Sequence, residues 1–383
     1  MECVSESSPA MVSIILPSYN HGDFIGEAIE SVLQQTYQDY EFLVSDDASS
    51  DHTAEILAKY ASRFPAGKYR YTIQEERLGP VGNANFLIRQ AKGKYIAMMN
   101  SDDYWHQDKL RFQLEHLGCR QDAVACFTWV SVVSENFSNL MSATSFNVKD
   151  SSQAEFLKKL WTEGNFFCHP SLLILRDVYH KIGYYNSAYR QLPDYEFWVR
   201  LLKYAPVTIL EQPLVYYRRT ANNTSSISRE NRIREITEYA EIYSSFFKGM
   251  PADLFRDAFR KFFRKGVARD ITPDTLSAKA FYLLFSESAY CEIAAKEAAI
   301  RLLFQESDNP EFGKILRDEY NISIFEQYQL TAQYGTGALF AEYFPAKQKA
   351  FWVKCKIKFA DTLCLKLLRM LRIQVSRLLL GRR

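Results

Sequence analysis

The sequence predicts an α/β fold in which a mostly parallel sheet, flanked by helices, is followed by an α-helical region. Over the first hundred residues, short apolar runs alternate with segments of helical periodicity, a pattern typical of right-handed crossovers in a parallel sheet. Three of the runs end in polar clusters, as strands do where a ligand binds. From about residue 229 onward helical periodicity dominates. The 383 residues, 47% of them hydrophobic, suffice for one large domain and a smaller one.

The individual elements follow from the spacing of apolar residues. Short apolar or β-branched runs predict strands at residues 12–16, 41–45, 69–74, 94–99 and 124–133. Apolar residues at helical spacing predict helices at residues 23–35, 52–63, 83–91 and 153–161, and a further helix from about residue 194.

The polar clusters that follow three of these strands are the first candidates for function. Tyr19 and Asn20 follow the first strand, Asp47 ends the second, and Asp102 and Asp103 end the fourth. Adjacent carboxylates repel each other, and a divalent cation is the usual remedy. The alternative is that Asp102 or Asp103 caps a helix that starts near residue 107. Because three clusters converge on one edge of the sheet, a binding site accounts for them better than caps alone.

The order of the motifs resembles that of family 2 glycosyltransferases with the GT-A fold. The matching segments are the opening strand at residues 12–20 (VSIILPSYN), the first helix at 28–37, the nucleotide-binding segment at 41–51, the approach to the DxD strand at 78–97 and the DxD-type motif at 100–105. Each motif alone is short, but their order and spacing extend the resemblance over roughly residues 12–226.

The resemblance implies a site for a nucleotide sugar. Asp47 is expected to accept a hydrogen bond from the base, since N3–H of uracil is a donor. Pro17, Tyr19 and Asn20 would frame the nucleotide, and Asp102 would contact the ribose or a cation.

The resemblance also implies a divalent metal cofactor, Mn²⁺ or Mg²⁺, held by Asp102 and Asp103. Such ions favour few carboxylates together with phosphate oxygens. This chain departs from the family pattern at Asn100, where the first acid of the DxD motif is expected. Asparagine can accept a hydrogen bond or ligate through its carbonyl, but it brings no charge.

A third acid, Asp194, stands where the family has its general base. Residues 192–201 (LPDYEFWVRL) resemble the family's acidic motif at the start of a helix, with Pro193 where another acid is common. Inverting transfer needs one carboxylate to take the proton of the acceptor hydroxyl. The structural alternative is that Asp194 caps the helix that follows it.

Candidates for contact with the diphosphate or the acceptor are Asn100, His169, Arg218 and Arg219. Arginine neutralises phosphate through two parallel hydrogen bonds. Thr220 replaces a histidine that the family often carries there. For His169, the alternative is a hydrogen-bonded histidine of the core.

Charge and cysteine content restrict the partners. The net charge of +2 gives no electrostatic case for nucleic acid. The seven cysteines are scattered without metal-ligand spacing, which indicates reduced thiols in a cytoplasmic protein. We find no signal peptide and no apolar run long enough to span a bilayer.

The last segment, residues 347–383, holds eleven Lys and Arg residues against one acid, Asp361. Its basic and apolar residues separate onto two faces of a helix, a pattern typical of binding to an anionic membrane surface. The alternative is a terminal helix that packs on the helical region and leaves its basic face in water.

We therefore predict three parts: a GT-A glycosyltransferase domain at residues 1–226, a helical C-terminal domain at 227–346 and a basic amphipathic tail at 347–383. The predicted activity is metal-dependent, inverting hexosyl transfer from a nucleoside-diphosphate sugar, expected to be a UDP-sugar. The expected acceptor is a glycan, lipid-linked, in bacterial surface polysaccharide assembly, on the inner face of the cell membrane. One rival is a catalytically weakened binding or scaffold protein, which Asn100, Pro193 and Thr220 motivate. Another is a nucleotidyltransferase, whose Gly-rich phosphate loop is missing after the first strand.

Overall fold

The computed structural model describes residues 11–134, 140–141, 145–219, 228–263 and 272–334. It divides the chain into two compact units, Met1–Asn321 and Ile322–Arg383. The predicted tail at 347–383 lies outside the described residues. The domain boundaries predicted at residues 226 and 346 stay predictions, because the compact units do not separate the sheet from the helices that directly follow it.

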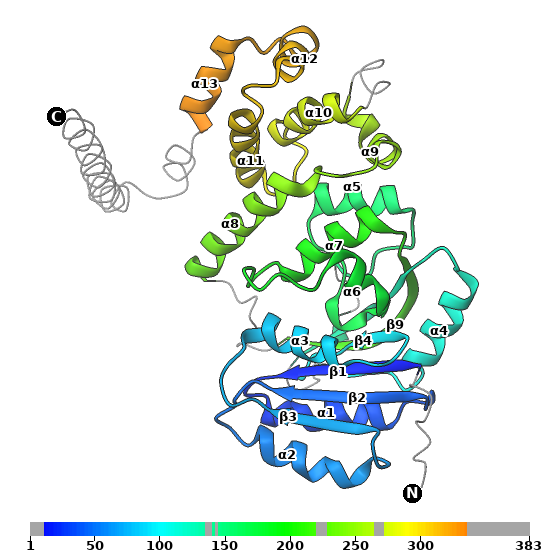
Figure 1. Ribbon diagram of the computed structural model, residues 1–383. Coiled ribbons are helices and arrows are strands. Elements are labelled where there is room, and N and C mark those ends of the chain that lie inside the picture. The colour runs from blue at the N-terminus through cyan, green and yellow to red at the C-terminus, as the bar shows by residue number, and fades with distance from the viewer. Residues whose placement is uncertain (1–10, 135–139, 142–144, 220–227, 264–271, 335–383) are drawn as a thin grey trace, which may run out of the picture. The chain divides into compact units, whose positions relative to one another are not determined.

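The first unit is built on a mixed, mostly parallel sheet (Figure 1). Its strands lie in the order β3 (Tyr69–Ile73), β2 (Tyr40–Asp46), β1 (Val12–Ser18), β4 (Tyr95–Met98), β8 (Leu173–Leu175), β6 (Ala125–Ser134), β9 (Thr208–Arg219) and β5 (Tyr104–Trp105), and β7 (Leu140–Met141) pairs with β6. The first four strands run parallel to one another, β8 is antiparallel to both of its neighbours, and β6 runs parallel to β9. The predicted α/β fold class is confirmed.

Helices connect and flank these strands (Figure 1). In the sheet region they are α1 (Gly22–Leu33), α2 (Thr53–Tyr60), α3 (Gly79–Gln90), α4 (Lys109–Cys119), α5 (Gln153–Glu163), α6 (Asp177–Ile182) and α7 (Pro193–Tyr204). The helical region contains α8 (Arg229–Phe246), α9 (Ala252–Phe259), α10 (Pro273–Phe285), α11 (Glu292–Gln305) and α12 (Pro310–Tyr320). The second unit contributes α13 (Ile324–Tyr334).

The core explains why the apolar runs become strands. Every residue of β2 is buried, and in β1 only Pro17 is not fully buried, as expected of central parallel strands covered on both faces. On α1 the apolar stripe formed by Ile25, Ala28, Ile29 and Val32 is fully buried. Burial of such side chains contributes about 1.5–3 kcal/mol each for the larger ones.

The helical region packs on the sheet region through aromatic side chains. Trp161 of α5 is fully buried. Its ring centroid lies 4.9 Å from that of Tyr243, 5.2 Å from that of Phe246 and 5.0 Å from that of Phe247. Trp161 Nε1 also donates to Ser288 Oγ over 2.9 Å. Helices α8 to α12 are therefore part of the same packed unit as α5.

Candidate active site

The loops after β1 and β2 are tied together by Asn20. This residue is exposed and has a positive φ of 52°, which asparagine tolerates better than most residues. Its backbone N–H donates to Ser49 Oγ over 2.7 Å, and its side-chain Oδ1 accepts from Ser50 N over 2.8 Å. The side chain of Asn20 thus organises the loops at the strand ends; its predicted contact with a nucleotide stays a prediction.

Asp47 lies at the end of β2 and is 2% exposed. Its two carboxylate oxygens accept hydrogen bonds from the N–H groups of Leu78 at 2.6 Å and Gly79 at 3.0 Å, where α3 begins. A carboxylate at a helix N-terminus is favoured by the orphan N–H groups and the helix dipole. Asp47 therefore has a capping role in this structure, and binding of a base by its carboxylate stays a prediction.

Arg77 is a residue that the sequence analysis missed at this edge of the sheet. Its guanidinium carbon lies 3.6 Å from the ring centroid of Tyr19, and its Nε lies 3.8 Å from Asp47 Oδ2. Arg77 thus joins two of the residues predicted to frame the nucleotide. The one available signal was its place directly before Leu78, next to a segment of the family motif.

The DxD-type loop, residues 100–103, contains one buried and one half-buried carboxylate. Asp103 is 1% exposed; its Oδ1 accepts from Arg218 N over 2.8 Å and its Oδ2 from Asn100 Nδ2 over 3.0 Å. Burial, followed by the charge of Asp102, raises the pKa of Asp103 well above its usual value. Asn100 therefore has a definite use: its amide donates to a carboxylate that an aspartate at the same position would repel.

Asp102 is half-buried. Burial raises its pKa, while the charges of His21 and Arg218 oppose that shift. The His21 ring, at the start of α1, bonds Ser101 Oγ at 2.7 Å. Of the two acids, Asp102 is the more accessible to a ligand, in keeping with its predicted role.

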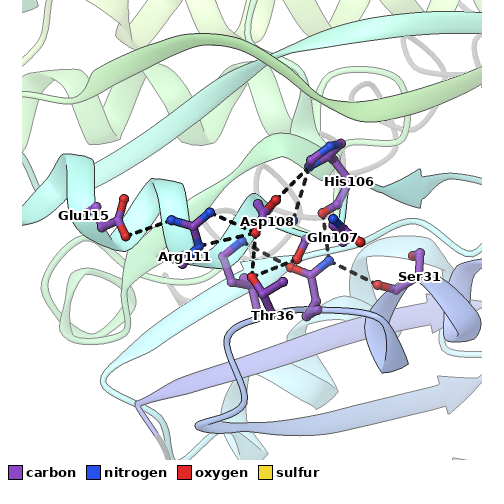
Figure 2. A network of polar contacts seen from close by, with 9 residues as sticks. Ser31, Thr36, His106, Gln107, Asp108, Arg111 and Glu115 are labelled. Carbon is purple, nitrogen blue, oxygen red and sulfur yellow. Dashed lines mark hydrogen bonds and ion pairs between the residues drawn. The ribbon is translucent and has the colours of Figure 1, made fainter.

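The alternative that Asp102 or Asp103 caps the next helix is wrong. That helix, α4, begins at Lys109, and its N-cap residue is Asp108. The loop between is fixed to the end of α1 instead (Figure 2). Thr36 N donates to Gln107 O over 2.8 Å and Thr36 Oγ1 to Asp108 Oδ1 over 2.8 Å. These bonds fix residues 107 and 108, which directly precede α4, to the residues that follow α1.

Arg218 of β9 holds the DxD-type loop. It is 2% exposed, and its Nε donates to the backbone oxygen of Asp102 over 2.8 Å. Its Nη2 forms an ion pair with Glu27 of α1. These bonds favour a structural role for Arg218. Arg219 is exposed, and the predicted diphosphate contacts of both arginines stay predictions.

Asp194 lies in the first turn of α7 and is half-buried. Its Oδ2 accepts from Asn165 Nδ2 over 2.7 Å and its Oδ1 from Tyr195 N over 2.8 Å. Burial raises the pKa of Asp194 to about 6, although both hydrogen bonds oppose the shift. The N-cap position of α7 belongs to Leu192. A carboxylate that gains a proton near neutral pH suits a general base.

His169 lies in a short 3₁₀ turn, His169–Ser171. Its Nε2 is 3.1 Å from the hydroxyl of Tyr185, and burial lowers the pKa of His169 to about 4. Tyr185 is itself fixed by Asn85 of α3, whose side chain bonds its backbone O and N at 2.7 and 3.1 Å. These contacts support the alternative of a hydrogen-bonded core histidine, and the role of His169 toward diphosphate stays a prediction.

The buried thiol of Cys168 is within electrostatic range of both Asp103 and Asp194. Burial raises the pKa of the Cys168 thiol well above its usual value, and the charges of Asp103 and Asp194 raise it further. Asp103 thus interacts electrostatically with Asp102 and, through the same buried thiol, shares an environment with Asp194. Such carboxylates can bind a cation, accept a proton and face the phosphates of a substrate.

The residues that are present fit a divalent cation held jointly with a substrate. Among the described residues, no group of three or more His, Cys, Asp or Glu side chains has metal-binding geometry. Both oxygens of Asp103 accept hydrogen bonds, so Asp102 is the better-placed protein ligand of the pair. The remaining ligands would have to come from phosphate oxygens and water, which is the usual arrangement for Mg²⁺.

The fold is of the GT-A type that the sequence predicts. The family model "Glycosyl transferase family 2" matches residues 13–183. Residues 13–183, slightly under half of the chain, are thus similar to that family, in agreement with the predicted resemblance.

Two relatives show how far the likeness extends. An uncharacterized glycosyltransferase of Methanocaldococcus jannaschii is 28% identical over 230 residues, which cover 59% of this chain and 76% of the relative. The putative teichuronic acid biosynthesis glycosyltransferase TuaG of Bacillus subtilis is 36% identical over 126 residues, which cover 33% of this chain and 49% of TuaG. This chain thus spans about half the length of TuaG.

A solved structure has the same fold. The crystal structure of S. aureus TarS 1-349 in complex with UDP-GlcNAc superimposes with a TM-score of 0.52 at 16% identity. The match covers 85% of this chain and 92% of that one.

Proposed function

We propose that this protein transfers a sugar, with inversion, from a UDP-sugar to a glycan acceptor. The observation that carries the proposal is Asp194, a half-buried carboxylate with a pKa raised to about 6. Its charge acts on the Cys168 thiol together with that of Asp103 in the DxD-type loop, which lies in the segment that matches the family 2 model. That combination matches a base beside a site for a departing diphosphate.

In the proposed reaction Asp194 takes the proton of the acceptor hydroxyl as its oxygen attacks the anomeric carbon. The bond from that carbon to the diphosphate breaks, and the nucleoside diphosphate leaves with the bonding electrons. Asn165 and the Tyr195 N–H orient the Asp194 carboxylate. A bound Mn²⁺ or Mg²⁺ at Asp102 would supply Lewis-acid stabilisation of the diphosphate.

For the donor nucleotide, the proposal uses the cluster of Tyr19, Asp47 and Arg77. The ring and the guanidinium already stack at 3.6 Å, so a planar base would find an aromatic and cationic surface beside a carboxylate that can accept its N–H. UDP is favoured because S. aureus TarS, in complex with UDP-GlcNAc, shares the fold.

The acceptor and the cellular location are parts of the same proposal. The printed name of TuaG supports an acceptor in bacterial surface polysaccharide assembly. A lipid-linked acceptor would place the enzyme on the inner face of the membrane, where the basic segment 347–383 meets anionic lipids. Helix α13 exposes Phe325 by 73% and Tyr328 by 63%, and such rings suit the membrane interface. Within the described residues, no helix is long and apolar enough to span a bilayer.

The rival function is a glycosyltransferase-like protein that binds without catalysis. Asn100 motivated this rival, but its hydrogen bond to Asp103 gives the residue a structural purpose. A thermal-shift screen over nucleotide sugars, followed by nucleoside-diphosphate release assays with Mn²⁺, separates the two. Stabilisation by UDP-sugars together with UDP release supports transfer. Stabilisation without release from any UDP- or TDP-sugar, with or without a glycan acceptor, supports the rival.

A further inference from the structure

The loop directly before α7 is held by a carboxylate from the helical region. Glu238 lies on α8 and is 7% exposed. It accepts hydrogen bonds from three consecutive backbone N–H groups: Arg190 N to Oε1, and Gln191 N and Leu192 N to Oε2, each at 2.8 Å. Leu192 is the N-cap residue of α7, and Asp194 follows two residues later.

A second set of contacts joins the same two helices. Gln191 Nε2 donates to Asn231 Oδ1 of α8 over 3.1 Å. The ring of Tyr195 packs edge-on against Tyr239, with centroids 5.2 Å apart. The residues before and after Asp194 are therefore both held by α8.

The choice of residue at position 238 indicates more than packing. A buried carboxylate loses several kcal/mol of hydration, and hydrogen bonds must compensate for that loss. Three N–H groups that converge on one carboxylate are a strong, directional arrangement. An apolar side chain at position 238 could fill the same space, but it would remove the acceptor of these three N–H groups. The carboxylate of Glu238 therefore fixes the backbone of residues 190–192.

We propose that Glu238 is a positioning residue for Asp194, through which the helical region completes the catalytic site. This inference rests on the proposed function, and it assigns a role to helices that carry none of the family's motifs. Displacement of a catalytic group by about 1 Å can cost roughly 100-fold in rate. The hydrogen bonds from residues 190–192 to Glu238 end two residues before Asp194, so their loss can move the Asp194 carboxylate far enough to lower turnover.

The charge of Glu238 supports the proposal. Among the causes that raise the pKa of Asp194, burial is the largest and the charge of Glu238 acts in the same direction. The other groups that face Asp194 are the amide of Asn165, the N–H of Tyr195 and, at longer range, the Cys168 thiol and the Tyr185 hydroxyl. Glu238 is the anion in this set, so its removal should make Asp194 easier to ionise.

The test is Glu238→Gln in the full chain, with Glu241→Gln as the matched control. Glu241 lies on the same helix, but its side chain is 63% exposed and pairs with Arg301. We measure kcat, the donor KM, the pH profile of kcat and the thermal shift caused by UDP. For Glu238→Gln we expect kcat to fall about 10- to 100-fold, with the donor KM and the UDP shift within twofold of wild type. The acid limb of kcat should move to lower pH, and Glu241→Gln should match wild type.

Two further variants separate geometry from charge. Glu238→Asp keeps the charge but shortens the side chain, so we expect a lower kcat with the acid limb unmoved. Asn231→Ala removes the hydrogen bond from Gln191 and should lower kcat without changing the donor KM. If Glu238→Gln does not fold, Asn231→Ala tests the same contact between α8 and the loop before α7.

A folded Glu238→Gln with wild-type kcat and pH profile would overturn the inference. A donor KM and UDP shift that change as much as kcat would also do so, because they indicate general disruption. The outcome is distinct from failure of the proposed function itself, in which the wild-type protein would release no nucleoside diphosphate.

Discussion

At the scale of single residues, the acids of the site differ in what already holds them. Asp47 and Asp103 are buried and each accepts two hydrogen bonds from neighbouring groups. Asp102 and Asp194 are half-buried, and burial raises the pKa of each. Asp47 and Asp103 therefore help to hold the loops of the site, and Asp47 retains lone pairs that can accept the N–H of a base. Asp102 and Asp194 have the more accessible carboxylates of the four, which suits contact with a cation or an acceptor hydroxyl.

The sequence alone identified these acids, but it did not show which of them hold the loops of the site and which are accessible to a ligand. Asp47 and Asp103 follow strands in the same way as Asp102 does, and nothing local shows that Leu78 or Arg218 will reach them. Those partners come from loops and strands far along the chain. Arg77 was missed for the same reason: it becomes notable only when folding brings it to Tyr19 and Asp47.

Asn100→Asp is the sharpest residue-scale test of the loop. The change restores the family's first acid, but it replaces the donor to Asp103 with a second carboxylate. We expect a loss of about 2 kcal/mol in the free energy of unfolding at pH 8, measured in urea without divalent ions. Burial and Asp102 already raise the pKa of Asp103, and a new charge raises it further, so the loss should shrink as the pH falls.

Asn100→Ala, which removes the donor without adding charge, is the control and should lose less. Mn²⁺ should restore stability to Asn100→Asp more than to wild type. Equal stability of Asn100→Asp and wild type at pH 8 would contradict this account of the loop.

At the scale of elements, the strands and helices with strong periodicity were predictable. The parallel strands β1, β2 and β4 lie within one or two residues of their predicted bounds, because they are buried on both faces. Strand β5 was not predicted: it has two residues, and it exists because β9 pairs with it. Helix α3 begins four residues before its predicted start, where Asp47 caps Leu78 and Gly79.

The packing of the helical region on the sheet region gives an element-scale prediction. Trp161 is fully buried among aromatic rings of α8. Trp161→Ala should destabilise the protein by about 3–5 kcal/mol, seen as a lower urea midpoint. Phe304→Ala is the control, because Phe304 is 66% exposed on α11; it should change stability by less than about 0.5 kcal/mol. Equal midpoints for the two variants would refute the proposed docking.

At the scale of the whole molecule, composition predicted size, core and the lack of an overall charge bias, but not how the helical region serves the site. The link between Glu238 and the loop before Asp194 joins residues 46 to 48 positions apart. No local pattern reports such a contact, because a buried glutamate on a helix resembles a surface one in sequence.

The basic segment 347–383 gives the whole-molecule prediction. Each basic residue near an anionic surface contributes about 1 kcal/mol, and the segment holds eleven. Deletion of residues 347–383 should weaken sedimentation with anionic liposomes by at least about 100-fold, with little effect on neutral ones. The UDP-induced thermal shift should be unchanged. Binding of the deletion variant equal to that of wild type would exclude the segment as the membrane anchor.

The most direct test of the central claim is the pH dependence of UDP-sugar consumption by wild type and by Asp194→Asn. A base must be unprotonated to accept a proton, and burial raises the pKa of Asp194 to about 6. Wild-type kcat should therefore fall tenfold per pH unit below about 6. Asp194→Asn should lose about 10²- to 10⁴-fold in kcat, lack that limb and still give a UDP-induced thermal shift. Wild-type turnover by Asp194→Asn, or an unchanged acid limb in that variant, would contradict Asp194 as the base.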